Sequence, residues 1–267
     1  MFTFIKKKKL FDLEARLNNE IDITRCRFDL DPATADEFDN IRYSIDYQSV
    51  FNKKNPLVTV CVGTYNRAKL LTTRTLPSIL NQTYSNIEVI VVGDCCTDST
   101  QDDVAALNDS RIQFINLEQR GEYPNTANDR WRVAGTKPFN HALSLAKGDF
   151  ITHLDDDDRF PEDRIEKLLA FAQQNCADIV WHPFYREKNN GKWKLMQANK
   201  FVAGSVTTSS VFYHNWFRCI GWDINAWRFK EPGDWNRFRK FRYLGANAHF
   251  YPEPMLYHYT EQSQNNA

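Results

Sequence analysis

The chain has 267 residues, of which 34 are Lys or Arg and 34 are Asp or Glu, so its formal net charge is zero. A quarter of the residues are charged and 42% are hydrophobic, which is typical of globular proteins and excludes collagen-like, disordered and coiled-coil chains. Zero net charge gives no general attraction to nucleic acid, so we expect no nucleic-acid partner. No run approaches the roughly 18 apolar residues of a membrane-spanning helix.

Residues 1–55 are predicted to be an N-terminal extension, because they are polar and carry no sustained hydrophobic period. Leu10, Leu13 and Leu17 have helical spacing, which predicts a short amphipathic helix near residues 10–18.

The start of the chain and its cysteines indicate a cellular location. The apolar residues ahead of the four lysines at 6–9 are too few for a secretory signal. Six Cys without a Cys-x-x-Cys pair are typical of reduced thiols, so we expect a cytoplasmic protein. Residues 2–9 predict either a peripheral contact with the anionic inner face of the cell membrane or a solvated arm. The oligomeric state stays open.

From residue 57 the pattern changes to short apolar runs that alternate with helical segments. This alternation is typical of βαβ units and predicts an α/β domain over residues 56–267 with a mixed, mostly parallel sheet flanked by helices. A hairpin turn is predicted at residues 189–191. The strands are expected at 57–63, 87–92, 112–117, 150–154 and 178–182, and helices at 70–80, 139–146 and 161–171.

Three polar segments follow predicted strands, at residues 64–67, 93–96 and 155–158, and the last is a run of four aspartates. Ligands of parallel sheets bind beyond the carboxyl ends of the strands, and four adjacent carboxylates there are costly unless a cation neutralises them. In an extended segment residues i and i+2 point to the same side, which predicts that Asp155 and Asp157 share one divalent ion. Oxygen ligands favour Mn²⁺ or Mg²⁺ and indicate a phosphorylated ligand. The alternative is a solvated acidic turn, or helix capping by Asp158.

These segments, in their order, resemble family 2 of the inverting glycosyltransferases, which have the GT-A nucleotide-sugar fold. The resemblance extends over about residues 56–264. The motifs that carry it are the strand and turn ending in Thr64-Tyr65-Asn66-Arg67, Ser78 to Tyr84 with its Gln-Thr-Tyr, Ile87 to Thr100 with its acidic turn, Asn140-His141-Ala142, Leu154 to Asp158 as an Asp-x-Asp motif, Ile220 to Asp223, Gly233-Asp234-Trp235-Asn236, and Pro252 to Tyr257 with Ser263.

The resemblance implies a role for each matching position. Asp234 is implied as the base that deprotonates the acceptor hydroxyl, with an N-cap as its alternative. The metal ligands implied are Asp157 as the direct ligand, Asp155 and His258, although any neighbouring pair of the four aspartates fits and a lone His in an aromatic strand is often structural. The implied nucleotide-binding residues are Thr64, Tyr65, Asn66, Arg67, Asp94, Lys137, Asp155 and Asp156.

The implied reaction is metal-dependent, inverting transfer of a sugar from a nucleotide-sugar, most simply a UDP-sugar, to a hydroxyl of a glycan or lipid-linked saccharide in bacterial surface polysaccharide assembly. Residues 56–160 would form the nucleotide-binding half and residues 161–267 the acceptor-binding half. The aromatic-rich region 181–222 is expected on the acceptor side or in the core. Two alternatives stay open: a nucleotidyltransferase, and a non-catalytic nucleotide-sugar-binding module.

The sequence also departs from the family pattern. Gly93 replaces the first Asp of an Asp-Asp pair, and Cys95-Cys96 replace Gly-Ser in the turn that follows. Phe139 stands where relatives place an Arg near the nucleotide, a role left open to Lys137, Arg132 or Arg120. Gly233 replaces the Glu before the base. These departures concern donor binding and the surroundings of the base rather than the reaction class.

Overall fold

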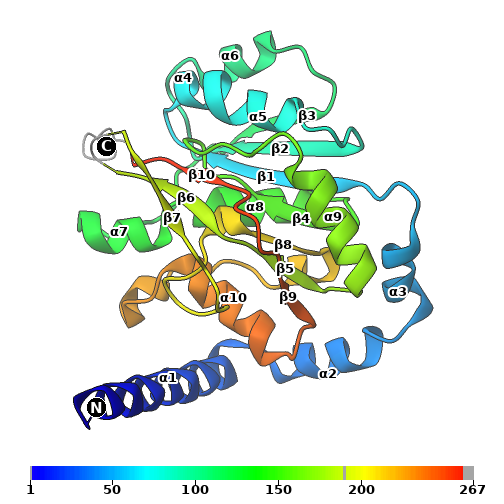
Figure 1. Cartoon of the computed structure of the whole chain (residues 1–267). Helices are drawn as coiled ribbons and strands as arrows, with labels where there is room; N and C mark the ends of the chain where they lie inside the picture. Colours follow the sequence, from blue (N-terminus) through cyan, green and yellow to red (C-terminus); the bar gives the residue numbers. More distant parts are fainter. Residues whose placement is uncertain (1, 189–190, 261–267) are drawn as a thin grey trace.

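The computed structural model describes residues 2–188 and 191–260, with the backbone alone for residues 2–9, 11 and 12. Two sheets organise the chain (Figure 1). The larger contains β1 (Val58–Thr64), β2 (Ile87–Gly93), β3 (Ile112–Asn116), β4 (Phe150–His153), β5 (Ile179–Trp181), β8 (Val211–His214) and β9 (Ala248–Phe250), and the smaller contains β6 (Phe184–Glu187), β7 (Trp193–Met196) and β10 (Tyr257–His258).

Helices connect and cover these strands. They are α1 (Phe2–Asp29), α2 (Pro32–Ile41), α3 (Ile45–Asn52), α4 (Ala68–Leu70), α5 (Leu76–Leu80), α6 (Thr100–Ala106), α7 (Ala127–Val133), α8 (Thr136–Leu145), α9 (Arg164–Asn175) and α10 (Gly233–Tyr243). Shorter turns are the π-helical η1 (Leu71–Thr75) and the 3₁₀ turns η2 (Thr208–Ser210), η3 (Asn215–Cys219) and η4 (Ala226–Phe229).

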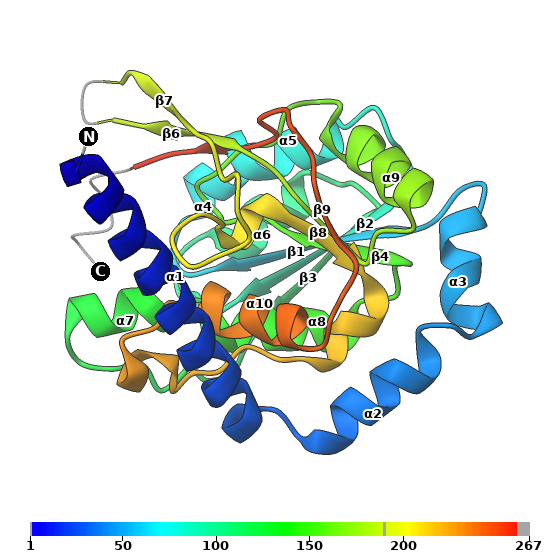
Figure 2. The ribbon, with the colours of Figure 1, turned by 60° about the horizontal axis from the view of Figure 1, so that its bottom comes forward.

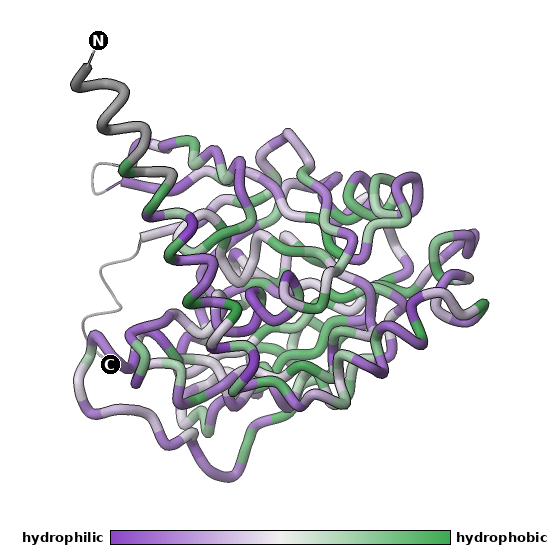
Figure 3. Tube along the Cα trace, turned by 90° about the horizontal axis from the view of Figure 1, so that it is seen from below, coloured by the Kyte–Doolittle hydropathy of each residue, from purple (hydrophilic) through white to green (hydrophobic). Residues whose placement is uncertain are grey.

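The large sheet has the strand order β3-β2-β1-β4-β8-β5-β9. Strands β3, β2, β1 and β4 are parallel to one another, and β8 runs antiparallel to both of its neighbours. The apolar, β-branched runs explain this topology, because strands buried on both faces belong in a sheet covered by helices. The predicted α/β class and its mostly parallel sheet are confirmed. Hydrophobic segments gather in the middle of the molecule (Figure 3).

The predicted hairpin forms between β6 and β7, which pair antiparallel. Its predicted turn residues Asn189 and Asn190 lie outside the described part of the chain, and so does Ser263.

The prediction of a short helix at 10–18 is wrong in length, because α1 extends over 28 residues. No Pro or Gly interrupts the chain before Pro32, so nothing ends the helix early. Asp31 then caps α2 by accepting a hydrogen bond from the Ala33 amide at 3.0 Å.

The second part of the extension belongs to the core of the α/β domain. Phe38 of α2 is fully buried, and its ring lies 4.7 Å from Trp216 and 5.3 Å from Phe217 between centroids. Tyr47 of α3 donates a hydrogen bond to Asp178 at 2.6 Å, next to β5. Helices α2 and α3 therefore pack as part of the α/β domain, although they precede residue 55.

Replacing Phe38 by Ala is expected to lower the free energy of unfolding by about 3–5 kcal/mol, because it removes a fully buried ring and leaves a cavity. Urea denaturation measures the change. Tyr43→Ala is the matched control, since Tyr43 is 76% exposed and its removal should cost less than about 0.5 kcal/mol. Equal effects of the two changes would contradict the packing of α2.

Helix α1 lies along one side of the molecule, beside α10 (Figure 2). Leu10, Leu13 and Leu17 are about 60% exposed and follow one another at helical spacing. Among the residues that the structure describes, no helix combines the length and the apolar character needed to cross a bilayer.

Candidate functional site

The carboxyl ends of β1, β2 and β4 lie side by side, and three polar segments continue from them. The Asp94 amide donates a hydrogen bond to the Thr64 carbonyl at 2.8 Å, which joins the ends of β2 and β1. Thr64 Oγ1 donates to Asp156 Oδ2 at 2.7 Å, which joins the ends of β1 and β4. The structure therefore gathers the three predicted segments at one edge of the sheet, as expected for parallel strands.

The four aspartates after β4 form a turn and not an extended segment. The Asp158 amide donates to the Asp155 carbonyl at 3.1 Å, which closes a turn centred on Asp156 and Asp157. The premise that alternate residues point to the same side is therefore wrong here. The turn sends the carboxylates in two directions, with the middle pair on one side and the outer pair on another.

The middle pair faces Arg67, which follows β1. Arg67 Nη1 donates to Asp156 Oδ1 at 3.0 Å and to Asp157 Oδ2 at 2.7 Å. Burial raises the pKa of Asp156 to about 6, against the opposing charge of Arg67. A buried carboxylate pair with a shared guanidinium is compensated within the protein, so Asp157 already has a cationic partner.

The outer pair faces His258 of β10. The ligand atoms of Asp155, Asp158 and His258 all lie within 4.8 Å of one another. His258 Nδ1 lies 2.9 Å from Asp158 Oδ2, and the Tyr259 amide donates to Asp158 Oδ1 at 2.9 Å. Burial, followed by the neighbouring Asp158, raises the pKa of Asp155 well above its usual range. Burial lowers the pKa of His258, but the charge of Asp158 outweighs it and raises the value to about 9.

This outer cluster fits a divalent cation. Two carboxylates and one imidazole are ligands that Mn²⁺ accepts, and their atoms are close enough to share one ion. Like charges held together are relieved when a cation binds among them. The predicted metal ligands Asp155 and His258 lie in the cluster, whereas Asp157 contacts Arg67; its assignment as the direct ligand stays a prediction.

Asp94 and Tyr65 lie under the loop that follows β3. The Gly121 amide donates to Asp94 Oδ1 at 3.0 Å, and Arg120 Nε lies 3.8 Å from Asp94 Oδ2. The Arg120 guanidinium lies 3.5 Å from the centroid of the Tyr65 ring. A flat cation therefore occupies the face of Tyr65, and Lys137 Nζ holds this loop by donating to the Gln119 carbonyl at 2.5 Å.

Asn66 holds the neighbouring turn. Its backbone has φ of 52°, a left-handed conformation that Asn tolerates. Its Oδ1 accepts a hydrogen bond from the Thr97 amide at 2.8 Å. Cys95 also has a positive φ, of 61°, at the position where the family motif has Gly. The two residues thus shape the loop next to Asp94.

Asp234 lies in the first turn of α10, and the N-cap of that helix is Pro232. The N-cap alternative for Asp234 is therefore wrong. Asp234 Oδ1 accepts a hydrogen bond from the Trp235 amide at 2.6 Å. Burial is the largest influence and raises the pKa of Asp234 to about 6, with a further increase from the charge of Glu231. This carboxyl group is therefore tuned toward neutral pH, which suits a general base.

The 3₁₀ turn η2 connects the acidic run with Asp234. The backbone amide of Thr208 lies near the Asp234 carboxylate and lowers its pKa slightly against the effect of burial. On the next residue, Ser209 Oγ accepts a hydrogen bond from the Asp155 amide at 3.0 Å. Asp155 and Asp234, 79 positions apart in the chain, thus lie near adjacent residues of one turn.

Most aromatic side chains of region 181–222 belong to the core. Trp181, Phe212, Tyr213 and Trp222 are buried, and 37% of Trp193 is exposed. The core alternative is thus confirmed for the four buried residues. The acceptor-side assignment of Trp193 stays a prediction.

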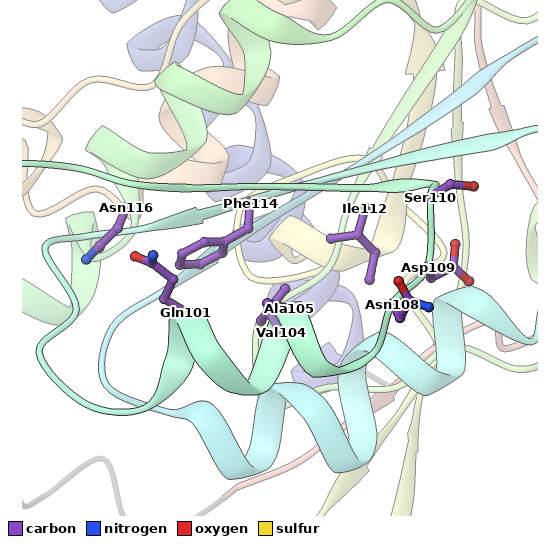
Figure 4. A pocket seen from close by; sticks show the side chains of 9 residues that line it. All are labelled: Gln101, Val104, Ala105, Asn108, Asp109, Ser110, Ile112, Phe114 and Asn116. Atoms are coloured by element: carbon purple, nitrogen blue, oxygen red, sulfur yellow. The ribbon is translucent and has the colours of Figure 1, made fainter.

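An open groove lies elsewhere, between α6 and β3 (Figure 4). The lining residues that the structure describes include none of the predicted site residues. They are Gln101, Val104, Ala105, Asn108, Asp109, Ser110, Ile112, Phe114 and Asn116.

Three site residues were missed by reasoning from the sequence. Asp158 was expected to cap a helix or face away, Arg120 was considered only as a replacement for a missing Arg, and Glu231 was not considered. A signal existed for Asp158, because it is part of the same aspartate run. The roles of Arg120 and Glu231 depend on contacts between distant segments, for which the sequence carries no local pattern.

Comparisons with known proteins show the family. The family model described as Glycosyl transferase family 2 matches residues 59–232. WcaA of Escherichia coli K12, whose name places it in colanic acid biosynthesis, is 38% identical over 187 residues, which cover 67% of this chain and 60% of WcaA. WfaP of Escherichia coli, named as a UDP-Glc:alpha-D-GlcNAc-diphosphoundecaprenol beta-1,3-glucosyltransferase, is 34% identical over 131 residues, or 50% of this chain and 48% of WfaP.

Solved structures share the fold. TarS of S. aureus, in complex with UDP-GlcNAc, superimposes with a TM-score of 0.62 at 22% identity, over 79% of this chain and 61% of that one. Mannosyltransferase PcManGT of Pyrobaculum calidifontis, in complex with GDP-Man and Mn²⁺, gives a TM-score of 0.58 at 17% identity, over 91% of this chain and 69% of that one. The chain spans 60% of the length of WcaA and about half that of WfaP.

Proposed function

The chain belongs to glycosyl transferase family 2, and from this premise we propose that it is a metal-dependent, inverting transferase. It would move a sugar from a UDP-sugar to a hydroxyl group of a glycan or lipid-linked saccharide, in the assembly of a bacterial surface polysaccharide. The UDP donor is supported by the fold shared with TarS, which was solved with UDP-GlcNAc, and by WfaP, whose name specifies UDP-Glc. The name of WfaP also supports the lipid-linked acceptor.

One observation carries the proposal. Turn η2 bonds to Asp155 through Ser209, and its Thr208 amide lies near Asp234, which supports one site for the candidate cation cluster and the carboxyl group with a raised pKa. Inverting transfer needs both parts, because the leaving diphosphate requires positive charge and the attacking hydroxyl requires a base. A nucleotidyltransferase reading has no support from the family match, which leaves the non-catalytic module as the alternative to test.

Different residues of the chain would bind the nucleotide and take the proton of the acceptor. Asp94 and Tyr65 would hold the nucleobase, and Arg120 would have to leave the Tyr65 face, where its guanidinium lies 3.5 Å from the ring centroid. Asn66 and Lys137 would shape the loops around the nucleotide. Asp234 would take the proton of the acceptor hydroxyl as that oxygen attacks the anomeric carbon from the side opposite the leaving group.

Asp155, Asp158 and His258 would hold Mn²⁺ or Mg²⁺, with Asp157 as a further ligand once Arg67 releases it. The ion would supply Lewis-acid stabilisation of the departing nucleoside diphosphate. Asp156 accepts hydrogen bonds from Thr64 and Arg67 next to that cluster, and these three residues would fix its position. Arg67 freed from Asp157 would carry a positive charge suited to a phosphate.

A donor screen tests the proposed function. Purified protein with Mn²⁺ is incubated with a panel of UDP-sugars and GDP-sugars, and both the thermal midpoint and the release of nucleoside diphosphate are measured. We expect a UDP-sugar to raise the midpoint by several degrees and to be hydrolysed slowly, because binding to the folded state stabilises it. Stabilisation without any turnover would indicate the non-catalytic module, and no response to either class would contradict the donor assignment.

We also propose a peripheral contact with an anionic membrane surface through the N-terminal part of α1. The lysines at 6–9 lie outside the residues whose side chains are described, so the structural support comes from exposed Leu10, Leu13 and Leu17. Exposed apolar side chains next to a basic run suit the headgroup region, where each Lys near an anionic surface contributes about 1 kcal/mol. Lipid-linked acceptors reside at such a surface.

Vesicle sedimentation measures this contact. We expect the protein to sediment with vesicles containing anionic phospholipid and to lose most of that binding when Leu10, Leu13 and Leu17 are all replaced by Gln. A variant with residues 6–9 changed to Gln should keep residual binding that no longer depends on salt. Ile45→Gln is the control, because Ile45 is exposed and lies in α3, outside α1. Equal sedimentation of all variants would contradict the contact.

A further inference from the structure

The second half of α1 docks on α10, the helix that carries Asp234. Asp22 accepts hydrogen bonds from Arg242 Nη2 at 2.8 Å and from Trp235 Nε1 at 3.3 Å. One and two helical turns further, Cys26 and Asp29 face Arg239. Helix α1 lies outside the stretch matched by the family model, which begins at residue 59. The docking of α1 on α10 is therefore not part of the stretch that the family model describes.

Arg239 is the centre of a buried ion network. Arg239 is 1% exposed, yet each of its three guanidinium nitrogens has a partner. Nε donates to Glu231 Oε1 at 2.8 Å, Nη1 lies 3.1 Å from Cys26 Sγ, and Nη2 pairs with Asp29. A buried guanidinium is tolerated only when its charge and donors are satisfied. Arg239 therefore ties α1, α10 and the segment before α10 into one unit.

Glu231 is the partner of Arg239 nearest to Asp234. It is 3% exposed and also accepts a hydrogen bond from Asn236 Nδ2 at 3.0 Å. From α1, Arg25 Nη1 approaches its carboxylate at 3.6 Å. Because Glu231 precedes Asp234 by three residues and Arg239 follows it by five, their ion pair spans the helix start on which Asp234 lies.

Gly233 lies where the start of α10 packs closely against α7. A Cβ atom at 233 would lie 3.0 Å from the Arg132 carbonyl oxygen of α7 and 3.7 Å from the Trp222 ring. The Glu that the family motif has directly before the base would therefore require α7 to move. Glu231 offers a carboxylate to the same helix start from a position with room for a side chain.

We infer that the Glu231–Arg239 ion pair, braced by Arg25 and Asp29 of α1, positions Asp234 for proton transfer. Glu231 and Arg239 are positioning residues, and the N-terminal extension is a functional part of the site. The inference rests on the proposed role of Asp234 as the base.

The network also acts on the charge of Asp234. Glu231 raises the pKa of Asp234. Arg239 and Arg25 pair with Glu231, and Asp29 pairs with Arg239, so we expect their charges to act on Asp234 through Glu231. From α7, the backbone carbonyl oxygen of Arg132 faces Gly233. Removing the charge of Glu231 should lower the pKa of Asp234. Removing the charge of Arg239 leaves Glu231 uncompensated and should raise it. A purely structural role would not produce shifts of opposite sign.

The test compares Glu231→Gln, Arg239→Met and Arg239→Lys in the full-length chain. The readouts are kcat, KM and the pH profile of hydrolysis of the UDP-sugar with the highest turnover in the donor screen, with titration by UDP and Mn²⁺ to count folded sites. We expect kcat per site to fall about 10- to 100-fold in Glu231→Gln and Arg239→Met with little change in KM. The acidic limb should move to lower pH in the first and to higher pH in the second, and Arg239→Lys should restore part of the activity.

Arg242→Met is the matched control, because it removes another α1–α10 ion pair that does not involve Glu231. It should keep kcat and the pH profile. Asp234→Asn separates the proposed role of Asp234 as the base from the inferred positioning role of Glu231 and Arg239. If it keeps full turnover, the base assignment fails. If Asp234→Asn is inactive while Glu231→Gln keeps kcat and its acidic limb, or both network variants shift the limb in the same direction, the inferred positioning role is overturned.

Discussion

Replacing Asp234 by Asn is expected to lower kcat for sugar transfer by about 10²–10⁴-fold, the usual contribution of a general base. Asn keeps the size of the side chain and the oxygen that accepts from the Trp235 amide at 2.6 Å, so the helix start should stay intact. Binding of UDP with Mn²⁺ should not change, because Asp234 is not among the residues proposed to hold the nucleotide or the metal. Calorimetric titration with UDP, alongside product formation, separates the two effects.

The pH profile of the unchanged protein provides a second measurement on the same group. Because burial raises the pKa of Asp234 to about 6, kcat/KM should fall about tenfold per pH unit below that value. The profile of Asp234→Asn should lack this limb. An unshifted limb in the variant would assign the titration to another group and contradict the base assignment.

Asp234→Asn should also stabilise the fold. The pKa of Asp234 is about 6 in the folded state against an ordinary value of 3.8, so the folded state loses stability as the pH rises through this window. Above pH 6 the loss in the free energy of unfolding is complete. Its upper bound is about 3 kcal/mol. Because Asp234 is partly exposed, we expect a loss on the order of 1–2 kcal/mol. We expect the variant to melt higher at pH 7.5 and at the wild-type temperature near pH 3.8. Lower thermal stability at pH 7.5 would contradict the burial of this charge.

Loss of Asp158 or His258 is expected to weaken Mn²⁺ binding by about 10- to 100-fold or more, since their ligand atoms lie with that of Asp155 within 4.8 Å. Asp158→Asn keeps an oxygen for the Tyr259 amide, and His258→Gln keeps a polar side chain. Direct titration with Mn²⁺ in the presence of UDP gives the affinity. Transfer activity should fall in parallel and recover in part at high Mn²⁺ concentration.

Asp157→Asn tests the sequence-based assignment within the same experiment. A loss as large as that of Asp158→Asn would show that Asp157 leaves Arg67 and joins the metal. Glu253→Gln is the control, because Glu253 is exposed and pairs with Lys167 away from the cluster. Unchanged Mn²⁺ affinity in both Asp158→Asn and His258→Gln would contradict the cluster.

The pH dependence of metal binding has a defined sign. The charge of Asp158 raises the pKa of His258 to about 9 although burial opposes it, so the imidazole carries a proton at neutral pH. A cation must displace that proton, and Mn²⁺ affinity should therefore rise with pH, by up to about tenfold per unit below pH 9. His258→Gln should flatten this dependence.

The sequence by itself determined the sheet and the edge where the site lies. Residues 58–62 and 87–92 are apolar and β-branched, and such local patterns predict buried strands without knowledge of their neighbours. Because parallel strands present their carboxyl ends at one edge, Thr64, Asp94 and Asp155 were correctly expected to lie near one another.

Only the tertiary structure decided how the charges are partnered. The turn closed by Asp158 and Asp155 divides four adjacent carboxylates between Arg67 and His258, and no spacing rule for an extended chain predicts that division. The same holds for Glu231 and Arg239, whose pairing is completed by a helix more than 200 positions earlier. Hydrophobic periodicity is a local property of the chain, whereas ion pairing in a buried site depends on which distant segments fold against one another.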